Sequence, residues 1–347
     1  MVKSVIFLFM FLTSMVANSQ DYQMLDYIGE LQKKAQKGDV EAICKLGVVY
    51  INFDRFKNFD KAFKCFKMAA DKGDALAMAN LAVMYLKGEG TNRDERKTIE
   101  YLIKASDGGN LQAHLILGSY YSTGEIVTKD EKKAFMYYER AAKMNDSDGL
   151  LKLGICYKDG KGTALDKEKA FEMIKKAAQK ENLSAKLQLA LMYKDGVGVK
   201  QNVEETIRIL NVIAEKSDIA LVYLGEFYEE GKYIGKDIEK AKSYYRQAAI
   251  CGIPLAESKY GNILYYEGKY KDAFETIKLA AEDKRQPVAE AMRKMAAFYR
   301  YGLNVVEPDS KKEKYWMDEA AKHHDAIAID ILQNSLGVTN NISYQIK

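Results

Sequence analysis

The sequence predicts an all-α solenoid of about eight stacked helix pairs, on the strength of three observations. One residue recurs at steps of 35 or 36 residues, small residues stand at matched positions in each period, and apolar residues follow helical steps of three and four. A fixed period of this length is typical of units that stack on their neighbours, so we expect one continuous array. The recurring residue, which we call the closing residue, is Tyr50, Tyr85, Tyr121, Tyr157, Tyr193, Tyr228, Leu264 and Tyr299.

The clearest copy of the repeat runs from Gly109 to Asn145. Its first helix is predicted from a face that ends at Tyr121, and Gly124 breaks that helix. After a polar turn, a second helix has the same periodicity, and Asn145 can end it because Asn tolerates a left-handed backbone. The face of the first helix is formed by Leu115, Leu117, Gly118 and Tyr121, and that of the second by Ala134, Tyr137, Tyr138, Ala141 and Ala142.

Small residues recur on both helices of every copy. Small residues at matched levels let two helices approach closely, as a tight antiparallel hairpin requires. Three residues before each closing residue stand Gly47, Ala82, Gly118, Gly154, Ala190, Gly225, Gly261 and Ala296. The second helices carry the pairs Ala69-Ala70, Ala105-Ser106, Ala141-Ala142, Ala177-Ala178, Ile213-Ala214, Ala248-Ala249, Ala280-Ala281 and Ala320-Ala321.

Three copies depart from the unit in their hairpin turns. Repeat seven has a short turn between Tyr266 and Tyr270, and repeat eight has a long one over residues 302–312. The turn of repeat one lacks glycine and contains Phe53, Phe56 and Phe59. These aromatic residues either cover the end of the stack or form a local contact site.

The ends of the chain differ from the repeats. Residues 1–19 are predicted to be a secretory signal peptide, with Lys3 before an apolar run and small residues before a cleavage site at Gln20. We therefore expect a periplasmic or secreted protein with no stable membrane span after cleavage, the alternative being an uncleaved anchor. Residues 20–37 are predicted to be an N-terminal capping helix, 38–324 the eight repeats, 325–336 a C-terminal capping helix, and 337–347 a flexible tail.

Composition and motifs argue against several functions. The 53 basic and 49 acidic residues leave a formal charge of +4, which does not indicate a nucleic-acid partner. No His-Glu-x-x-His, Gly-x-Ser-x-Gly or paired-cysteine metal motif occurs, so we expect no catalytic residues, cofactor or metal. His323 and His324, with Glu319 and Asp325, are either a weak metal site or, as we favour, a solvated helix end.

The repeats resemble the Sel-one-like repeat family, which is related to tetratricopeptide repeats. The resemblance covers residues 38–333 and rests on Leu-Gly-x-x-Tyr, on Gly-x-Gly turns such as Gly160-Lys161-Gly162 and Gly196-Val197-Gly198, and on Lys-Ala-x-x-Tyr-Tyr-x-x-Ala-Ala. It implies a right-handed superhelix of helix pairs with a concave groove. It also implies an adaptor that holds protein partners, as in bacterial envelopes, host-interaction proteins and the degradation machinery of the endoplasmic reticulum.

The cysteines do not follow the pattern of the family. Some relatives carry paired cysteines near the small pair and four residues before the glycine, and neither position is cysteine here. Cys44 and Cys65 lie at matched heights of one hairpin and are the candidate disulfide, whereas Cys156 and Cys251 fall in different repeats. The alternative is four small thiols in the protein interior.

The resemblance places the candidate groove on the first helices, along two rows of residues. Row one follows each closing residue: Ile51, Leu86, Ser122, Lys158, Lys194, Glu229, Tyr265 and Arg300. Row two follows each small residue: Val48, Val83, Ser119, Ile155, Leu191, Glu226, Asn262 and Ala297. A groove that is apolar at its start and charged toward its end suits a peptide or protein partner. We therefore predict an exported, non-enzymatic scaffold; the alternatives are an envelope or cell-wall enzyme with an unrecognised active site, or a lumenal adaptor of a eukaryotic degradation complex.

Overall fold

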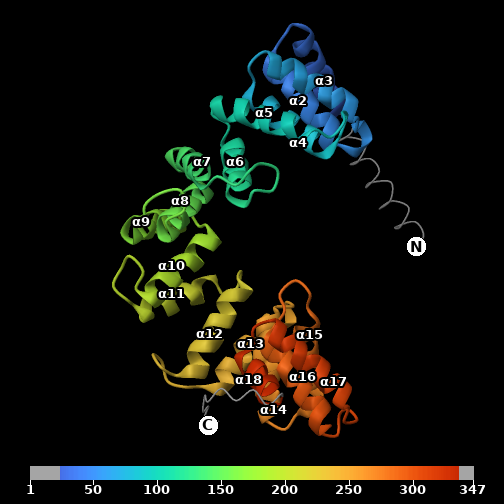
Figure 1. Cartoon of the computed structure of the whole chain (residues 1–347). Helices are drawn as coiled ribbons and strands as arrows, with labels where there is room; N and C mark the ends of the chain where they lie inside the picture. Colours follow the sequence, from blue (N-terminus) through green and yellow to red (C-terminus); the bar gives the residue numbers. More distant parts are fainter. Residues whose placement is uncertain (1–23, 336–347) are drawn as a thin grey trace, which may run out of the picture. The chain divides into compact units, whose positions relative to one another are not determined.

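The computed structural model describes residues 24–335, and every regular element in this range is a helix (Figure 1). The chain divides into two compact units, Met1–Lys180 and Glu181–Lys347, which are described separately. After a helix over residues 24–36, unit 1 contains α2 (Val40–Asn52), η1 (Asp54–Phe56), α3 (Phe59–Asp71), α4 (Ala75–Lys87), α5 (Glu95–Asp107), α6 (Leu111–Thr123), α7 (Glu131–Lys143), α8 (Ser147–Asp159) and α9 (Lys167–Gln179). Unit 2 contains α10 (Leu183–Asp195), α11 (Val203–Ile213), α12 (Asp218–Glu230), α13 (Ile238–Ile250), α14 (Pro254–Tyr266), α15 (Tyr270–Glu282), α16 (Ala289–Tyr301), α17 (Ser310–Lys322) and α18 (Ala326–Ser335). The predicted signal peptide and tail lie outside the described residues.

Short polar side chains set where most of the helices begin, and glycine sets where most first helices end. The Asp130 carboxylate accepts a hydrogen bond from the amide of Lys133, which satisfies one free donor at the start of α7. Asn110 caps α6 in the same way. Gly124 ends α6 in the left-handed conformation (φ 81°, ψ 21°), and Asn145 after α7 also has a positive φ of 60°. The predicted helix ends at Gly124 and Asn145 are therefore confirmed.

The closing residue joins the two helices of each pair through its backbone. The amide of Asp130 donates to the carbonyl oxygen of Tyr121 at 2.8 Å, and an equivalent bond of 2.8 to 3.0 Å is present in all eight repeats. The ring of Tyr121 also lies under the ammonium group of Lys133, 5.1 Å from its centroid. Six repeats share this cation–π contact: Lys61 on Tyr50, Lys97 on Tyr85, Lys133 on Tyr121, Lys169 on Tyr157, Lys240 on Tyr228 and Lys312 on Tyr299. The tyrosine that marks the period is thus a structural residue of the hairpin.

The small residue of the first helix makes room for a large side chain of the second. A Cβ added to Gly154 would lie only 2.6 Å from Cγ1 of Ile174, so the side chain of α9 occupies the place of the missing methyl group. The five repeats with glycine carry an aromatic or β-branched residue at this facing position: Phe66, Tyr138, Ile174, Tyr245 and Ile277. The three with alanine carry unbranched or γ-branched residues at the equivalent position: Leu102, Leu210 and Met317. The Gly or Ala choice therefore follows the shape of the facing side chain.

The second glycine of the Gly-x-Gly turn has a packing role. Gly162 has a φ of +72°, and a Cβ on it would collide with the backbone carbonyl of Glu131 at the start of α7. Gly90 approaches the backbone of Phe59 in the same manner. These turns press against the second helix of the preceding repeat, where only glycine can approach so closely.

Unit 1 is closed at its start by the helix over residues 24–36. Ile28 and Leu31 of this helix are buried against α2, in a cluster with Ala42, Leu46 and Val49. Two of the three aromatic residues in the first turn belong to the stack, because Phe56 packs on this cluster and Phe59 on the next one. Phe53 is 40% exposed.

The last helix of unit 2, α18, packs on repeat eight. Ala328 is fully buried in the cluster formed by α14 to α17, and Ile331 and Leu332 pack against it. The short turn of repeat seven leaves α15 without a side-chain cap. In the long turn of repeat eight, Leu303 and Val306 cover the same cluster. Across residues 24–335, no helix combines the length and hydropathy that a membrane crossing requires.

Candidate partner-binding surface

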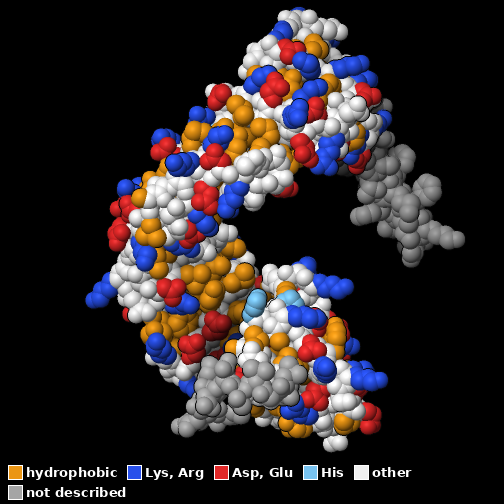
Figure 2. Space-filling view, viewed as in Figure 1, with side chains coloured by type: hydrophobic (Ala, Val, Ile, Leu, Met, Phe, Trp, Pro, Cys, Tyr) orange, Lys and Arg blue, Asp and Glu red, His pale blue; other side chains and the backbone are white. Residues whose placement is uncertain are grey.

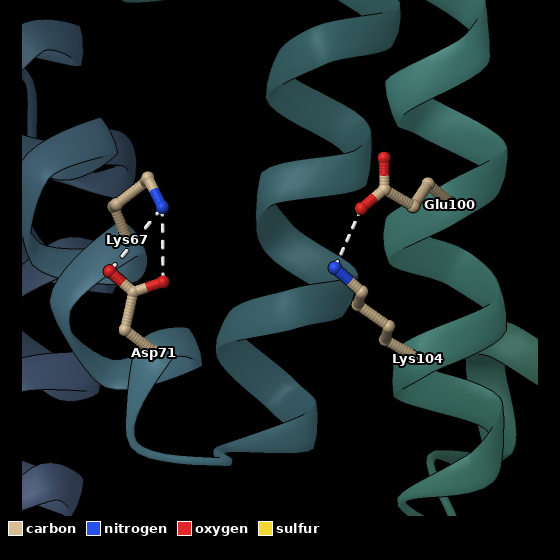
Figure 3. A network of polar contacts seen from close by, with 4 residues as sticks. All are labelled: Lys67, Asp71, Glu100 and Lys104. Carbon is tan, nitrogen blue, oxygen red and sulfur yellow. Dashed lines mark hydrogen bonds and ion pairs between the residues drawn. The ribbon is translucent and has the colours of Figure 1, made fainter.

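In unit 1, the exposed faces of the second helices carry ion pairs, whereas row one on the first helices starts with apolar residues. Exposed ion pairs lie along α3 and α5: Lys67 bonds Asp71 at 3.0 Å and Lys104 bonds Glu100 at 2.6 Å (Figure 3). Such pairs on a solvated helix contribute only about 0.3 to 0.5 kcal/mol each and mark a face that stays in water. Row one starts instead with Ile51, which packs against the core of α2 to α4.

An apolar pocket of about 220 Å³ lies among α4, α5 and α6, where the two rows meet. Row one contributes Leu86, and row two contributes Val83 and Ser119. Its full lining is Ala82, Val83, Leu86, Thr98, Leu102, Ile116, Ser119 and Tyr120. A gathering of hydrophobic side chains is visible over α5 and α6 in Figure 2. Because Leu86 is half-buried and Val83 is 37% exposed, this pocket can receive an apolar side chain from outside.

Row one continues in unit 1 with Ser122 and Lys158, both half-buried. Burial raises the pKa of the Tyr138 hydroxyl on the second helix, and the neighbouring Ser122 side chain opposes that shift. Lys158 lies 3.9 Å from a carboxylate oxygen of Asp159. Along row one, unit 1 therefore presents apolar residues on α2 and α4, followed by a polar residue on α6 and a basic residue on α8.

In unit 2, the rows carry half-buried charges. Glu229 of α12 accepts a hydrogen bond of 2.7 Å from the hydroxyl of Tyr245 and lies 3.4 Å from the ammonium group of Lys259. Glu226, one turn earlier, makes no hydrogen bond or ion pair with residues 24–335. Burial raises the pKa of the Glu226 carboxyl, and Lys259 and Lys194 oppose that shift. This stretch is thus a half-buried acidic surface with Lys259 and Lys194 nearby.

One residue of each row in unit 2 adds to it, Asn262 of row two and Lys194 of row one. The Asn262 amide donates to Glu290 at 2.9 Å, while its buried carbonyl oxygen has no partner within the described range. Lys194 of row one lies 5.2 Å over the ring of Tyr223 and 3.8 Å from Asp195. These contacts link α10 to α12 and α14 to α16.

The last two residues of row one have structural partners. Tyr265 packs edge-on against Phe298 and Tyr270, and the ammonium group of Lys294 lies 4.4 Å over its ring. Arg300 forms an ion pair with Glu313 of α17 at 2.6 Å. These contacts tie α14 and α16 to their neighbours, so Tyr265 and Arg300 are engaged within the fold.

Sequence reasoning missed the contribution of the second helices. Tyr138 and Tyr245 each cross a first helix at its glycine, Gly118 or Gly225. The hydroxyl of Tyr245 donates to Glu229, four positions after Gly225, and Ser122, four positions after Gly118, is a polar neighbour of Tyr138. The sequence did contain a signal for this contact, namely a glycine on the first helix together with a tyrosine at the facing position of the second helix. It identifies repeats three and six as those where a second-helix tyrosine neighbours a polar residue of row one.

The remaining candidates have mostly structural surroundings. Cys44 is buried, and Cys65 packs against the cluster that contains it; both are free thiols here, and their pairing stays a prediction. His114 is buried and shares a 2.8 Å hydrogen bond with Ser106. Within residues 24–335, no group of three or more His, Cys, Asp or Glu side chains could hold a metal ion.

Comparison with known proteins identifies the repeats. The Sel1 repeat model matches residues 40–74, 75–110, 111–146, 147–182, 183–217, 218–253 and 289–325. The helix pair α14–α15 fills the interval between the last two matches. Proteins of this class are generally protein-interaction scaffolds.

Solved structures share the fold. A Sel1 repeat protein from Oxalobacter formigenes is 25% identical, with a TM-score of 0.67 over 89% of this chain and 90% of that one. The protective antigen c5321 of uropathogenic Escherichia coli strains, which displays an SLR fold, is 24% identical, with a TM-score of 0.57 over 90% of this chain and 76% of that one. No curated protein matches the sequence. These similarities confirm the predicted all-α solenoid of helix pairs, and the chain belongs to the Sel1 repeat family.

Proposed function

We propose that this chain is a non-enzymatic scaffold that binds a peptide or protein partner along the two rows of its first helices. The observation that carries the proposal is the apolar pocket among α4, α5 and α6, which both rows line. Its accessible lining is almost entirely apolar, with Leu86, Val83 and Ile116 around it. An apolar side chain of a partner that enters it would contribute about 1.5 to 3 kcal/mol through burial.

The charged residues of the rows would orient the partner. Lys158 in unit 1 and Lys194 in unit 2 offer positive charge, whereas Glu226 and Glu229 offer negative charge within unit 2. Complementary charges of this kind affect association rate and binding register more than affinity. We expect a partner segment with an apolar anchor and charged flanks.

We also propose that the chain acts outside the cytoplasm, in the periplasm or after secretion, once residues 1–19 have been cleaved before Gln20. The charged start, the apolar run and the small residues before the cleavage site support this proposal. N-terminal sequencing of the protein from its native host tests it. A mature protein that begins at residue 1 would contradict it.

Capture of partners by the tagged mature chain, followed by mass spectrometry, tests the binding surface. Leu86→Ser should lose the specific partner, because the change removes an apolar wall of the pocket. Leu76→Ser is the matched control: Leu76 lies on the same helix, is 53% exposed and does not line the pocket. It should retain the partner, and circular dichroism should report the same helix content in both variants.

Two further double variants probe the rows. Ile51→Ser with Leu86→Ser removes apolar contacts, and Lys158→Glu with Lys194→Glu reverses charge while leaving the fully buried core unchanged. A partner that both double variants and Leu86→Ser retain as well as the wild type would exclude the rows as its binding surface. The exposed Phe53 would then be the next residue to change.

A further inference from the structure

A second cavity lies in unit 2, formed by residues outside both rows. It has a volume of about 650 Å³, within the range of pockets that hold small ligands. The end of α15, the following loop, α16 and α17 surround it. Its lining is Ala281, Glu282, Asp283, Lys284, Pro287, Met292, Tyr315, Trp316, Glu319 and His323.

One wall of this cavity is an aromatic pair. The rings of Tyr315 and Trp316 lie 5.2 Å apart at an interplanar angle of 71°, and Tyr315 is 55% exposed. Trp316 is the single tryptophan of the chain. An indole face attracts cations more strongly than a phenol or phenyl face.

Elsewhere in this unit, a pair formed by the half-buried Tyr265 and the exposed Tyr266 already holds a cation. The ammonium group of Lys294 lies 4.4 Å from the ring centroid of Tyr265 and 4.7 Å from that of Tyr266. Within residues 24–335, by contrast, no lysine or arginine lies over the ring of Tyr315 or Trp316. The pair in the cavity wall, Tyr315 and Trp316, therefore offers aromatic rings to a cation as Tyr265 and Tyr266 do, but none of the described lysines or arginines lies over them.

The cavity also carries an excess of negative charge. Its carboxylates are Glu282, Asp283 and Glu319, against one lysine, Lys284, and the imidazole of His323. Two carboxylates are already engaged, since Asp283 accepts from Arg285 and from the amide of Gln286, and Glu319 accepts from Lys322. Glu282 is exposed and forms no hydrogen bond or ion pair with the described residues. It is the carboxylate that can pair with an incoming cation.

We propose that this cavity binds a cationic side chain, an arginine or lysine of a partner segment. The charged head would lie between Glu282 and the aromatic pair, and the aliphatic stem would pack on Met292 and Pro287. A planar guanidinium can both stack on Trp316 and pair with a carboxylate, so arginine should bind better than lysine. The site does not depend on the rows of the first helices.

The fluorescence of Trp316 can report binding at this cavity. The full chain is titrated with N-acetyl-arginine amide while tryptophan fluorescence is followed, and N-acetyl-citrulline amide serves as the neutral control of nearly the same shape. The cation should give a saturable change at millimolar concentration, and the neutral probe should give none. Equal responses to both probes, or no saturable response to the cation, would overturn the proposal.

Two substitutions on α15 sharpen the test. Glu282→Gln should weaken binding of the arginine probe about fivefold to tenfold, because it removes the unpaired carboxylate and preserves the size of the side chain. Glu275→Gln lies on the same helix, is exposed and is outside the cavity, so binding should stay at the wild-type level. If Glu282→Gln bound the arginine probe as tightly as the wild type, Glu282 would not pair with the cation, and the proposed pairing would be wrong. A positive result with the probe alone would stand even if the rows bound no partner.

Discussion

Ile174 of α9 occupies the space that a side chain on Gly154 of α8 would need, with Cγ1 only 2.6 Å from the position of the missing Cβ. Ile174 is fully buried, so it can move little. Where alanine replaces this glycine in other repeats, leucine or methionine replaces the facing residue. The two positions therefore behave as one packing unit.

We predict that Gly154→Ala destabilises the protein by about 1 to 3 kcal/mol, because the new methyl group overpacks the hairpin. Adding Ile174→Leu should recover at least half of that loss, since Ala with Leu is the combination at Ala82 and Leu102. Urea unfolding of both variants measures the effect. Gly29→Ala is the control: this helical glycine has nothing within 4 Å of its absent Cβ, and the change should be neutral or stabilising by up to about 1 kcal/mol. Additive losses in the double variant would contradict the pairing.

The turn glycines allow a second comparison. Gly162 and Gly109 both have positive φ, +72° and +79°, but only Gly162 lies against the backbone of another helix. Gly109→Ala should cost about 1 kcal/mol for the left-handed backbone alone. Gly162→Ala should cost clearly more, because the Glu131 carbonyl must also move. If both variants lost the same stability in thermal unfolding, the close approach of Gly162 to α7 would not contribute to stability.

Burial lowers the pKa of His114, and the charge of Arg140 adds to that shift while Asp107 opposes it. The unfolded chain takes up a proton near its ordinary pKa of about 6.5, whereas the folded chain does so only at lower pH. The contribution of His114 to stability is therefore complete above about pH 6.5 and is lost as the pH falls below it.

The double variant Ser106→Ala with His114→Leu should remove this dependence, because the equivalent pair one repeat later, between repeats three and four, is Ala142 and Leu150. We expect the melting temperature of the wild type, relative to that of the variant, to fall as the pH is lowered from about 7.5 to about 5.5. Other titrating groups are common to both proteins and cancel in the difference. A difference that does not change with pH would mean that His114 titrates normally in the fold.

Thiol reactivity should follow burial in the reduced protein. Burial raises the pKa of Cys44 to about 12 and that of Cys156 to about 11, so neither forms appreciable thiolate at neutral pH. Cys251 is exposed and should react with iodoacetamide first, although a hydrogen bond to Asp218 raises its pKa as well. Peptide mapping by mass spectrometry measures the order. Labelling of Cys44 before Cys251 would contradict it.

We further predict that Cys44 and Cys65 form a disulfide in the oxidised protein. A bridge that closes a loop of about twenty residues should stabilise the fold by about 3 kcal/mol, and reduction should remove that contribution. Thiol titration of the unfolded, unreduced protein should then find two free thiols. Four free thiols would exclude the bridge.

Much of this protein could be determined from the sequence because its information is local and repeated. The caps at Asp130 and Gly124, the closing position at Tyr121 and the small residues of each hairpin act within one repeat, and eight copies make their spacing visible. For the same reason, the rows of candidate residues could be placed on the first helices. The period itself says nothing about which side chains of different helices meet.

Only the tertiary structure decided which side chains of different helices are in contact. The apolar pocket needs side chains from three helices, and Glu229 gains its partner because the ring of Tyr245 crosses α12 at Gly225. The cavity beside Trp316 likewise joins residues from three helices and the loop between two of them. Such contacts depend on side-chain direction across packed helices, which varies from repeat to repeat while the backbone pattern stays the same.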